Sequence, residues 1–455
     1  MDIQNVIYLG VYNNRNIEIF GVSYVHVMQL ADYNLHWRPS FSYGFPIRRD
    51  RFSDLVRVIG KHTIIVVTGM RRTGKTTMMK QAIDHLVSSG VARDNILFYS
   101  FDEPGNSIES VVKEYERGLV GVKGGDGGGF VSSKETFYIF LDEVQKVPGW
   151  QEQVKYYFDH VANVRLLVSG SSALFLRKDT RESLAGRTYE MMLGPLSFAE
   201  YLRFAGKSYM LEKVLLHEDE LGREYERYLT RQFIDTVSED DTFVREYLSG
   251  IIEKVVYIDI PRRFGTEGME TLMSLVRMMA SRPGLLLNLS TLAGELGLDR
   301  HTLSNYIGLL RDSFLVRVGY NFSRSAIASE RKMKKAYLSN PAFSLLSHTP
   351  VETPRLVECD AFVSLGARSF WMSPAKDEVD IVLMNEKVPI PVEVKYKDSI
   401  TNEDMRGVRK FMRRFKVKRA FLITRSLSED RELPEGMVHA VPAFKVALDP
   451  GMLLG

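Results

Sequence analysis

This sequence contains little cysteine, no long apolar run and a small net charge. The 455 residues include one cysteine, Cys359, so an internal disulfide is excluded and a cytoplasmic location is expected. The longest apolar runs, such as 64–68, are far shorter than the ~20 residues of a membrane-spanning helix. The first residues also lack the basic region, apolar core and cleavage site of a signal peptide. We therefore expect a cytoplasmic protein with no membrane partner.

The net charge is only +3, from 60 basic and 57 acidic residues, which by itself implies no nucleic-acid partner. The charge is unevenly placed, however. Residues 217–241 contain nine acids and three bases, whereas residues 395–419 contain ten bases and three acids. The acidic stretch favours a solvated helix over an acidic docking site, and the basic stretch favours a phosphodiester partner such as DNA.

The length predicts about three domains, and alternating elements predict the class of the first. Apolar runs typical of buried strands alternate with helical patterns, which indicates a parallel sheet with crossover helices. The strands are expected at 64–68, 96–101, 137–141 and 164–169, and the helices at 54–59, 76–88, 109–116 and 151–160.

A phosphate-binding motif follows the first of these strands. Residues 69–76 fit G-x-x-x-x-G-K-[ST] between a strand and a helix, the context this motif requires. Its glycines let the backbone surround phosphates, and Lys75 would reach the β- and γ-phosphates of ATP. The predicted nucleotide-binding residues are Gly69, Arg71, Arg72, Thr73, Gly74, Lys75, Thr76 and Thr77.

Two acids end the third strand and complete the predicted site. Thr76 and Asp142 would hold Mg²⁺, and Glu143 would orient and deprotonate the attacking water. A helix N-cap is the alternative explanation of the acidic pair, although the preceding apolar strand favours catalysis. Small polar residues after the fourth strand are suited to a γ-phosphate sensor, and Arg187 is a candidate arginine finger. A turn and an ordinary surface arginine are the respective alternatives.

Four segments together resemble one family. They read GMRRTGKTT, FLDEVQKVPGW, LLVSGSSALFL and LAGRTYEMMLGPLSFAEYL. They are similar to the AAA-type ATPase module of an archaeal and bacterial family that joins it to a winged helix and a C-terminal domain of unknown function. The resemblance covers about residues 50–450. It implies Ser171 as a sensor, Arg187 as a sensor or transition-state arginine, and Glu143 as a catalytic residue.

A helix-turn-helix pattern is predicted within 285–320. Ser290 is expected to cap a short helix and Asp299 a second one, followed by a strand at 314–318. A lid that packs on the nucleotide module without touching DNA is the alternative. The residues placed to face a major groove are Arg300, His301, Ser304 and Asn305.

Carboxylates and a lysine gather near the end of the chain. Strands expected at 378–383 and 390–395 bring Asp380 beside Glu393 and Lys395, with Glu358 as a further acid. Two carboxylates can bind a divalent cation, here a second metal besides the Mg²⁺ of ATP, and a lysine can position a hydrolytic water. This D…E-x-K order looks like the core of restriction endonucleases. Charged residues on an exposed strand face are the alternative.

The expected fold class is α/β: a P-loop AAA-type parallel sheet with flanking helices, then a winged helix and a restriction-endonuclease-like α/β domain. The expected divisions are an N-terminal extension of unassigned fold at 1–50, the ATPase at 51–205, a helical linker and winged helix at 206–345, and the nuclease-like domain at 346–455. A mis-assigned start upstream of Met28 is the alternative for the extension. The favoured function is an ATPase that acts on or near DNA. A nucleotide-dependent switch that binds a protein partner, with an inactive C-terminal domain, is the alternative, and the oligomeric state is left open.

Overall fold

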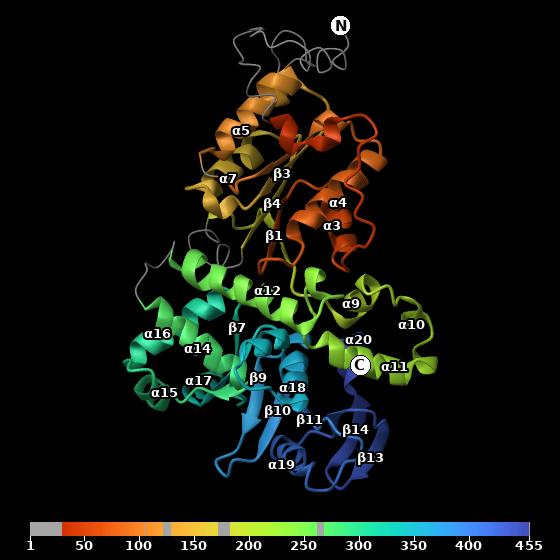
Figure 1. Ribbon diagram of the computed structural model, residues 1–455, viewed down its shortest axis with the longest axis vertical. Coiled ribbons are helices and arrows are strands. Elements are labelled where there is room, and N and C mark those ends of the chain that lie inside the picture. Colours follow the sequence, from red (N-terminus) through yellow and green to blue (C-terminus); the bar gives the residue numbers. More distant parts are fainter. Residues whose placement is uncertain (1–29, 104, 122–128, 172–182, 262–267, 455) are drawn as a thin grey trace. The chain divides into compact units, whose positions relative to one another are not determined.

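The chain forms two compact units. The computed structural model describes residues 30–103, 105–121, 129–171, 183–261 and 268–454 (Figure 1). The first unit comprises Met1–Gly69 and Gly74–Leu193, and the second comprises Met70–Thr73 and Gly194–Gly455. Most of the glycine-rich segment 121–129, part of the small polar segment after the fourth strand and the candidate start at Met28 lie outside the described residues.

The first unit contains a parallel sheet of five strands in the order β2-β3-β4-β1-β5. Each expected strand and helix is present to within a few residues. The strands are β1 Ile64–Gly69, β2 Ile96–Ser100, β3 Phe137–Asp142, β4 Val164–Ser171 and β5 Thr188–Met192. The helices are α3 Phe52–Val58, α4 Lys75–Ser88, α5 Ile108–Tyr115 and α7 Trp150–His160.

Two apolar clusters lie on the two faces of this sheet. Side chains alternate along β1, so Ile65 and Val67 pack with α3 and α4, whereas Ile64 and Val66 pack with α5 and α7. Figure 1 shows the two helix pairs on opposite faces of the sheet. The first unit is therefore a three-layer α/β fold, and the parallel strands present their carboxyl ends along one edge.

Residues 30–50 pack on the open edge of the sheet. β2 is an edge strand, and the carbonyl of Ile96 at its start accepts hydrogen bonds from His36 Nε2 at 2.9 Å and Trp37 Nε1 at 2.7 Å. The Asn34 side chain accepts the amide proton of Phe98 at 2.6 Å. Burial lowers the pKa of His36 to about 4, so this imidazole is neutral at pH 7. The described part of the N-terminal stretch thus belongs to the first unit and covers backbone groups that would otherwise form an exposed edge.

The second unit contains a mixed sheet of nine strands in the order β13-β14-β12-β11-β10-β9-β7-β8-β6. The strands are β6 Leu285–Leu286, β7 Val316–Asn321, β8 Lys334–Leu338, β9 Ser369–Met372, β10 Glu378–Asn385, β11 Val388–Val394, β12 Arg419–Thr424, β13 Glu429–Leu433 and β14 Gly436–Pro442. The helices are α9 Phe198–Phe204, α10 Tyr209–Glu212, α11 Glu218–Tyr228, α12 Asp241–Lys254, α14 Met269–Ser281, α15 Leu289–Glu295, α16 Arg300–Asp312, α17 Ala326–Arg331, α18 Thr353–Ser364, α19 Arg406–Phe415 and α20 Ala443–Leu448.

This sheet runs across the predicted boundary at 345/346. β7 pairs in parallel with β9, with Tyr320 opposite Ser369 and Asn321 opposite Phe370. The Asn321 side chain adds two hydrogen bonds of 3.1 Å to the backbone of Met372. The region predicted as a winged helix and the region predicted as nuclease-like therefore share one hydrogen-bonded sheet.

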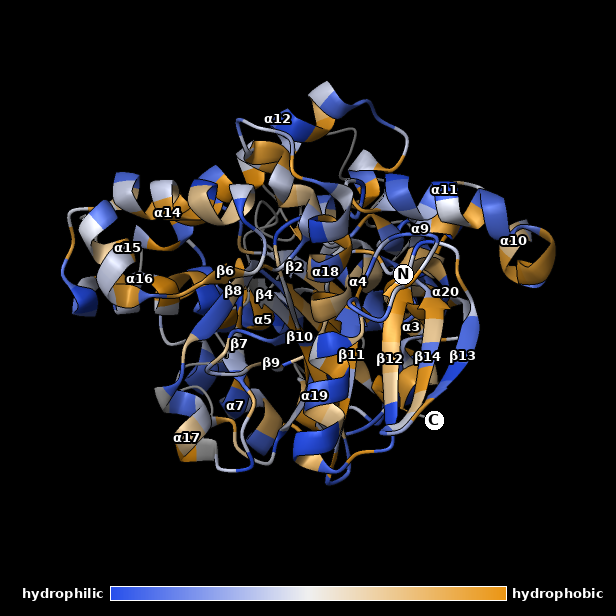
Figure 2. Ribbon diagram, turned by 90° about the horizontal axis from the view of Figure 1, so that it is seen from below, coloured by the Kyte–Doolittle hydropathy of each residue, from blue (hydrophilic) through white to orange (hydrophobic). Residues whose placement is uncertain are grey.

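The C-terminal part of the sheet is covered on both faces. One face packs against α9, α11, α18 and α20, and the other packs against α19. Figure 2 shows β12 and β14 as largely hydrophobic and α19 as a helix of two faces. Pro389 and Pro391 lie in β11 before Val392, where the pairing with β12 begins. Proline has no N–H to donate, and at these two positions β11 is paired with β10 alone.

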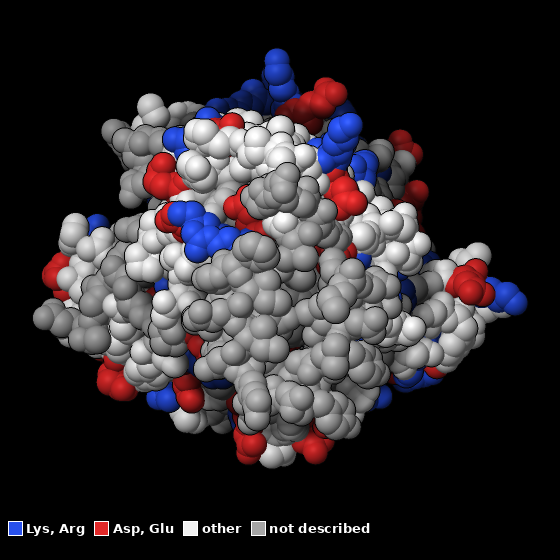
Figure 3. Space-filling view, turned by 90° about the horizontal axis from the view of Figure 1, so that it is seen from above, with Lys and Arg blue, Asp and Glu red and all other residues white. Residues whose placement is uncertain are grey.

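Among the described residues, none of the helices combines the length and the hydropathy needed to cross a membrane. Charged side chains of both signs are interspersed over the described part of the face in Figure 3. This distribution agrees with the small net charge.

Candidate functional site

The predicted phosphate-binding residues lie where β1 ends and α4 begins. Gly74 caps α4 with φ of +88°, a left-handed conformation that favours glycine, and no side chain caps this helix. The start of α4 thus has the backbone amides and the dipole that favour an anion. Lys75 is 5% exposed, and its Nζ donates to the carbonyl oxygen of Gly69 at 3.1 Å. The lysine is therefore held beside the helix start.

Thr76 and Asp142 are brought together from α4 and β3. The Thr76 hydroxyl donates to Asp142 Oδ2 at 2.6 Å, and the Ser169 hydroxyl donates to Asp142 Oδ1. Asp142 and Ser169 are both buried. A hydroxyl at the start of α4 and a carboxylate at the end of β3 are oxygen ligands of the kind that Mg²⁺ prefers, so these residues fit the metal that accompanies ATP. Ser169 was missed as a site residue, although it lies in the small polar segment that the sequence singled out.

Glu143 follows β3 with a strained backbone. Its φ is +57°, which costs a non-glycine residue about 1–3 kcal/mol and is frequent at functional sites. Gln145 donates a hydrogen bond to its carboxylate. Glu143 therefore lies directly after Asp142, the last residue of β3, and Gln145 holds its carboxylate.

The two remaining catalytic candidates lie at opposite ends of the sheet. The backbone of Ser171 pairs with Gly69, which places Ser171 at the phosphate end. Arg187 precedes β5, and its carbonyl accepts the amide proton of Ile64 at the start of β1, five residues before Gly69. Its guanidinium makes two hydrogen bonds to Asp159, at 2.8 and 3.1 Å. Arg187 thus lies away from the phosphate loop of its own chain. An arginine-finger role stays a prediction, and it would require Arg187 to act on the nucleotide of another copy of the chain.

The middle of the loop, Met70–Thr73, groups with the second unit. Arg71 makes a bidentate ion pair with Asp259, both contacts measuring 2.7 Å, and the guanidinium of Arg72 lies 6.0 Å from the ring centroid of Tyr247. Thr73 donates to the carbonyl of Met70 at 2.9 Å. The last predicted nucleotide-binding residue, Thr77, lies half-buried in the first turn of α4. The predicted roles of these four residues toward ATP stay predictions.

Helix α16 presents the predicted DNA-binding residues on one exposed face. Arg300, His301, Ser304 and Asn305 are exposed, whereas Leu303, Ile307 and Leu310 are buried on the opposite side. Asp299 caps the helix as expected, but the preceding helix α15 is capped by Asn288 and not by Ser290. α15, α16 and β7 follow one another in the predicted order. The winged-helix assignment and the contact of this face with DNA both stay predictions.

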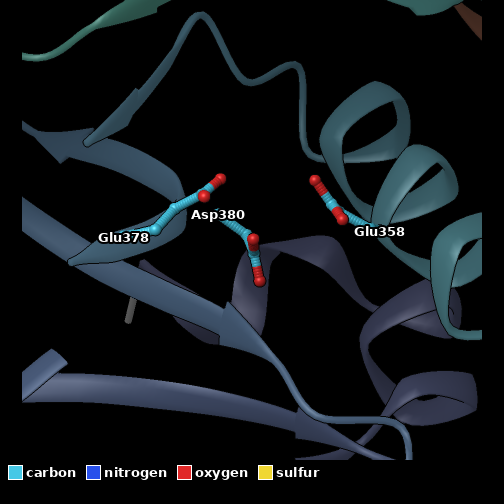
Figure 4. A group of neighbouring side chains, drawn as sticks. All are labelled: Glu358, Glu378 and Asp380. Atoms are coloured by element: carbon cyan, nitrogen blue, oxygen red, sulfur yellow. The ribbon is translucent and has the colours of Figure 1, made fainter. Parts of the chain in front are cut away.

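The predicted nuclease-like residues also converge. The Asp380 amide donates to Glu393 Oε2 at 3.3 Å, and Lys395 Nζ donates to Glu393 Oε1 at 2.6 Å, which agrees with the expected strand face. Burial and the nearby Glu358 carboxylate raise the pKa of Asp380 to about 7, and burial together with Asp380 also raises that of Glu393. Figure 4 shows Glu358 on α18 facing Glu378 and Asp380 on β10. Oxygen atoms of these three lie within 4.8 Å of one another.

Sequence reasoning missed two members of this cluster, Glu378 and Lys335. Glu378 precedes Asp380 by two residues, so strand periodicity was the available signal. Lys335 comes from β8, and its ammonium forms ion pairs with Glu358 at 3.0 Å, with Asp380 at 3.8 Å, and with Glu378. No local pattern predicts this, because the lysine lies far before the acids in the chain.

The basic stretch 395–419 is largely paired with acids. Arg406 and Lys410 contact Asp377 at 3.0 and 2.7 Å, and Arg409 and Arg413 contact Glu435 at 3.3 and 2.9 Å. These pairs hold the pKa values of both carboxyl groups below the usual range for Asp and Glu. These two acids outside the stretch therefore offset part of its local excess of +7.

Family models match three consecutive regions of the chain. Residues 61–202 match the AAA domain, residues 232–348 match a domain of unknown function, DUF8612, and residues 363–445 match another, DUF4143. The first match agrees with the five-stranded parallel sheet and its flanking helices. The first unit thus has the P-loop fold of an AAA-type nucleotide-binding module, and a second α/β sheet follows it.

Two relatives and a solved structure are similar over most of the chain. An uncharacterized protein of Haemophilus influenzae strain KW20 / Rd is 31% identical over 273 residues, which cover 59% of this chain and 65% of that relative. Uncharacterized protein MJ1544 of Methanocaldococcus jannaschii is 21% identical over 355 residues, covering 75% and 76% respectively. The structure of Orc1 from Aeropyrum pernix in complex with DNA is 13% identical, covering 70% of this chain and 96% of that one at a TM-score of 0.30. Neither relative's name states an activity, and a TM-score this low transfers none.

Proposed function

We propose that the protein binds ATP and hydrolyses it with Mg²⁺. The observation that carries the proposal is the 2.6 Å contact of the Thr76 hydroxyl with Asp142 Oδ2, which joins two predicted magnesium ligands from separate elements. The match of residues 61–202 to the AAA domain supports the same class of activity.

Each residue at the phosphate end has a distinct task in this proposal. Lys75 and the amides at the start of α4 bind the phosphates, and Ser169 orients the carboxylate of Asp142. When bound, Mg²⁺ neutralises charge on the phosphate oxygens. Glu143 accepts the proton of the attacking water through its carboxylate.

Replacing Thr76 by valine tests the magnesium site. The variant keeps the shape of the side chain but loses the hydroxyl, so Mg²⁺-stimulated hydrolysis should fall at least about tenfold. Steady-state phosphate release is measured with Mg²⁺ and with EDTA. Ser88→Ala, which removes a hydroxyl at the far end of α4, is the control and should match the wild type. Equal Mg²⁺ stimulation in wild type and Thr76→Val would exclude this site.

We further propose that ATP turnover operates a switch whose C-terminal domain binds a partner without cutting DNA. The specific support is the pairing of the basic stretch with Asp377 and Glu435, which reduces the charge available to phosphates. Action on or near DNA through α16 remains the competing hypothesis.

The salt dependence of DNA affinity separates the two hypotheses. For the switch, binding of a labelled duplex should be weak and change less than about tenfold between 50 and 200 mM salt, because few phosphates are neutralised. Fluorescence anisotropy of the wild type and of Arg300→Ala measures this. Glu295→Ala, at the exposed end of the preceding helix, is the control. Nanomolar affinity with a steep salt slope that Arg300→Ala reduces would favour the DNA hypothesis instead.

A further inference from the structure

The carboxylate cluster of the C-terminal domain already contains a cation. Lys335 is 3% exposed, and its Nζ lies among Glu358, Glu378 and Asp380. These are the three acids whose oxygen atoms lie close enough to share a metal ion. A buried ammonium and a divalent cation cannot both take the place at which these oxygens converge, so the residues as arranged do not fit a second metal.

The surroundings hold Lys335 in its charged form. Burial by itself lowers the pKa of a lysine, but the carboxylates of Glu358, Asp380 and Glu378 outweigh it and raise the pKa of Lys335 above its usual value. Glu358 Oε1 also accepts the hydroxyl proton of Tyr337 at 2.8 Å, and its Oε2 contacts Arg355 at 2.9 Å. The buried ammonium is thus one member of a hydrogen-bonded set that extends through Arg355 to the surface.

The pairing of strands in the sheet explains why no local sequence motif includes Lys335. Lys335 on β8 is paired with Gly319 on β7, and Phe370 on β9 lies 5.4 Å from the ammonium, measured to its ring centroid. A larger residue at position 319 would crowd the aromatic rings here, because its Cβ would lie 2.9 Å from Phe362 Cζ. The shared sheet thus brings a lysine from the region before 345 to acids after 346.

We infer that Lys335 is a built-in cation that replaces a divalent metal in this cluster and fastens the β7–β8 segment to the C-terminal domain. The domain accordingly has no metal-dependent nuclease chemistry at Glu358, Glu378 and Asp380. Removing the ammonium should turn the cluster into a divalent-cation site. This inference is independent of ATP hydrolysis, which is assayed in the same preparations and should not change.

Binding of Mn²⁺ in the absence of nucleotide tests the inference on folded protein. The wild type and Asp380→Asn should bind the same number of Mn²⁺ ions by isothermal titration calorimetry, because the cluster of the wild type accepts none. A Mn²⁺ ion bound by the wild type and lost in Asp380→Asn would overturn the inference. This comparison needs no change at Lys335, so it holds whether or not lysine variants fold.

Lys335→Ala provides the second arm. It should lower the Tm by roughly 5–10 °C, because buried carboxylates lose their counter-charge. It should also bind one additional Mn²⁺ ion, which Lys335→Ala/Asp380→Asn loses, and millimolar Mn²⁺ should raise its Tm but not that of the wild type. Lys334→Ala removes the neighbouring lysine, whose ion pair with Glu330 is more exposed, and is the control. A folded Lys335→Ala that gains no Mn²⁺ site would contradict the replacement of a metal by lysine.

Discussion

Replacing Glu143 by glutamine is expected to lower ATP turnover by about 10²–10⁴-fold and to leave the Kd for ATP within about twofold of the wild type. The amide has the size of the carboxylate but cannot accept the proton of the attacking water. Glu143 directly follows Asp142, the last residue of β3, in a left-handed conformation that is costly for a non-glycine residue and frequent at functional sites. Single-turnover hydrolysis and binding of a fluorescent ATP analogue measure the two quantities separately.

The control for this variant is Glu190→Gln, an exposed glutamate on β5. It should hydrolyse ATP at the wild-type rate. If Glu143→Gln did the same, the general base would have to be another group. If it lost ATP binding as well as turnover, Glu143 would have a structural and not a catalytic role.

Replacing Lys75 by alanine is expected to weaken ATP binding by about 10–150-fold, the equivalent of losing a charged hydrogen bond of about 1.5–3 kcal/mol. The lysine is buried beside Gly69 at the start of α4, so alanine removes the one side-chain ammonium placed there by the motif. Equilibrium binding of the fluorescent analogue at fixed Mg²⁺ gives the Kd.

Lys61→Ala is the matched control, because Lys61 is an exposed lysine shortly before β1. Its Kd should equal that of the wild type. An unchanged Kd in Lys75→Ala would show that nucleotide does not bind at the P-loop. A lowered Tm in Lys75→Ala without added nucleotide would indicate that the bond to Gly69 also contributes to folding, and the Kd would then be measured at a lower temperature.

The fold of the first unit was largely predictable from local patterns. A parallel strand buried on both faces is a continuous apolar run, so β1 to β4 stand out in the sequence. Their sequence order also predicts which edge carries the loop and the acids. The packing of residues 30–50 was not predictable, because His36 and Trp37 stabilise the edge through single hydrogen bonds to Ile96 and not through a periodic pattern.

The candidate sites were predictable where their residues are close in sequence or follow a strand period. Thr76, Asp142, Asp380 and Glu393 were expected and do converge with their predicted neighbours. Residues whose roles depend on tertiary pairing were not predictable. Counting charges over 395–419 gives the sign of the stretch but cannot show that Asp377 and Glu435 pair with four of its bases.

The pairing of β7 with β9 has a mechanical consequence. A hinge needs a segment whose backbone hydrogen bonds can be broken cheaply, and a strand inside a nine-stranded sheet is not one. The regions on either side of residue 345 should therefore move as a single body and lose their structure in one transition. A displacement of α16 and β7 would therefore be expected to shift Glu358, Glu378 and Asp380 as well.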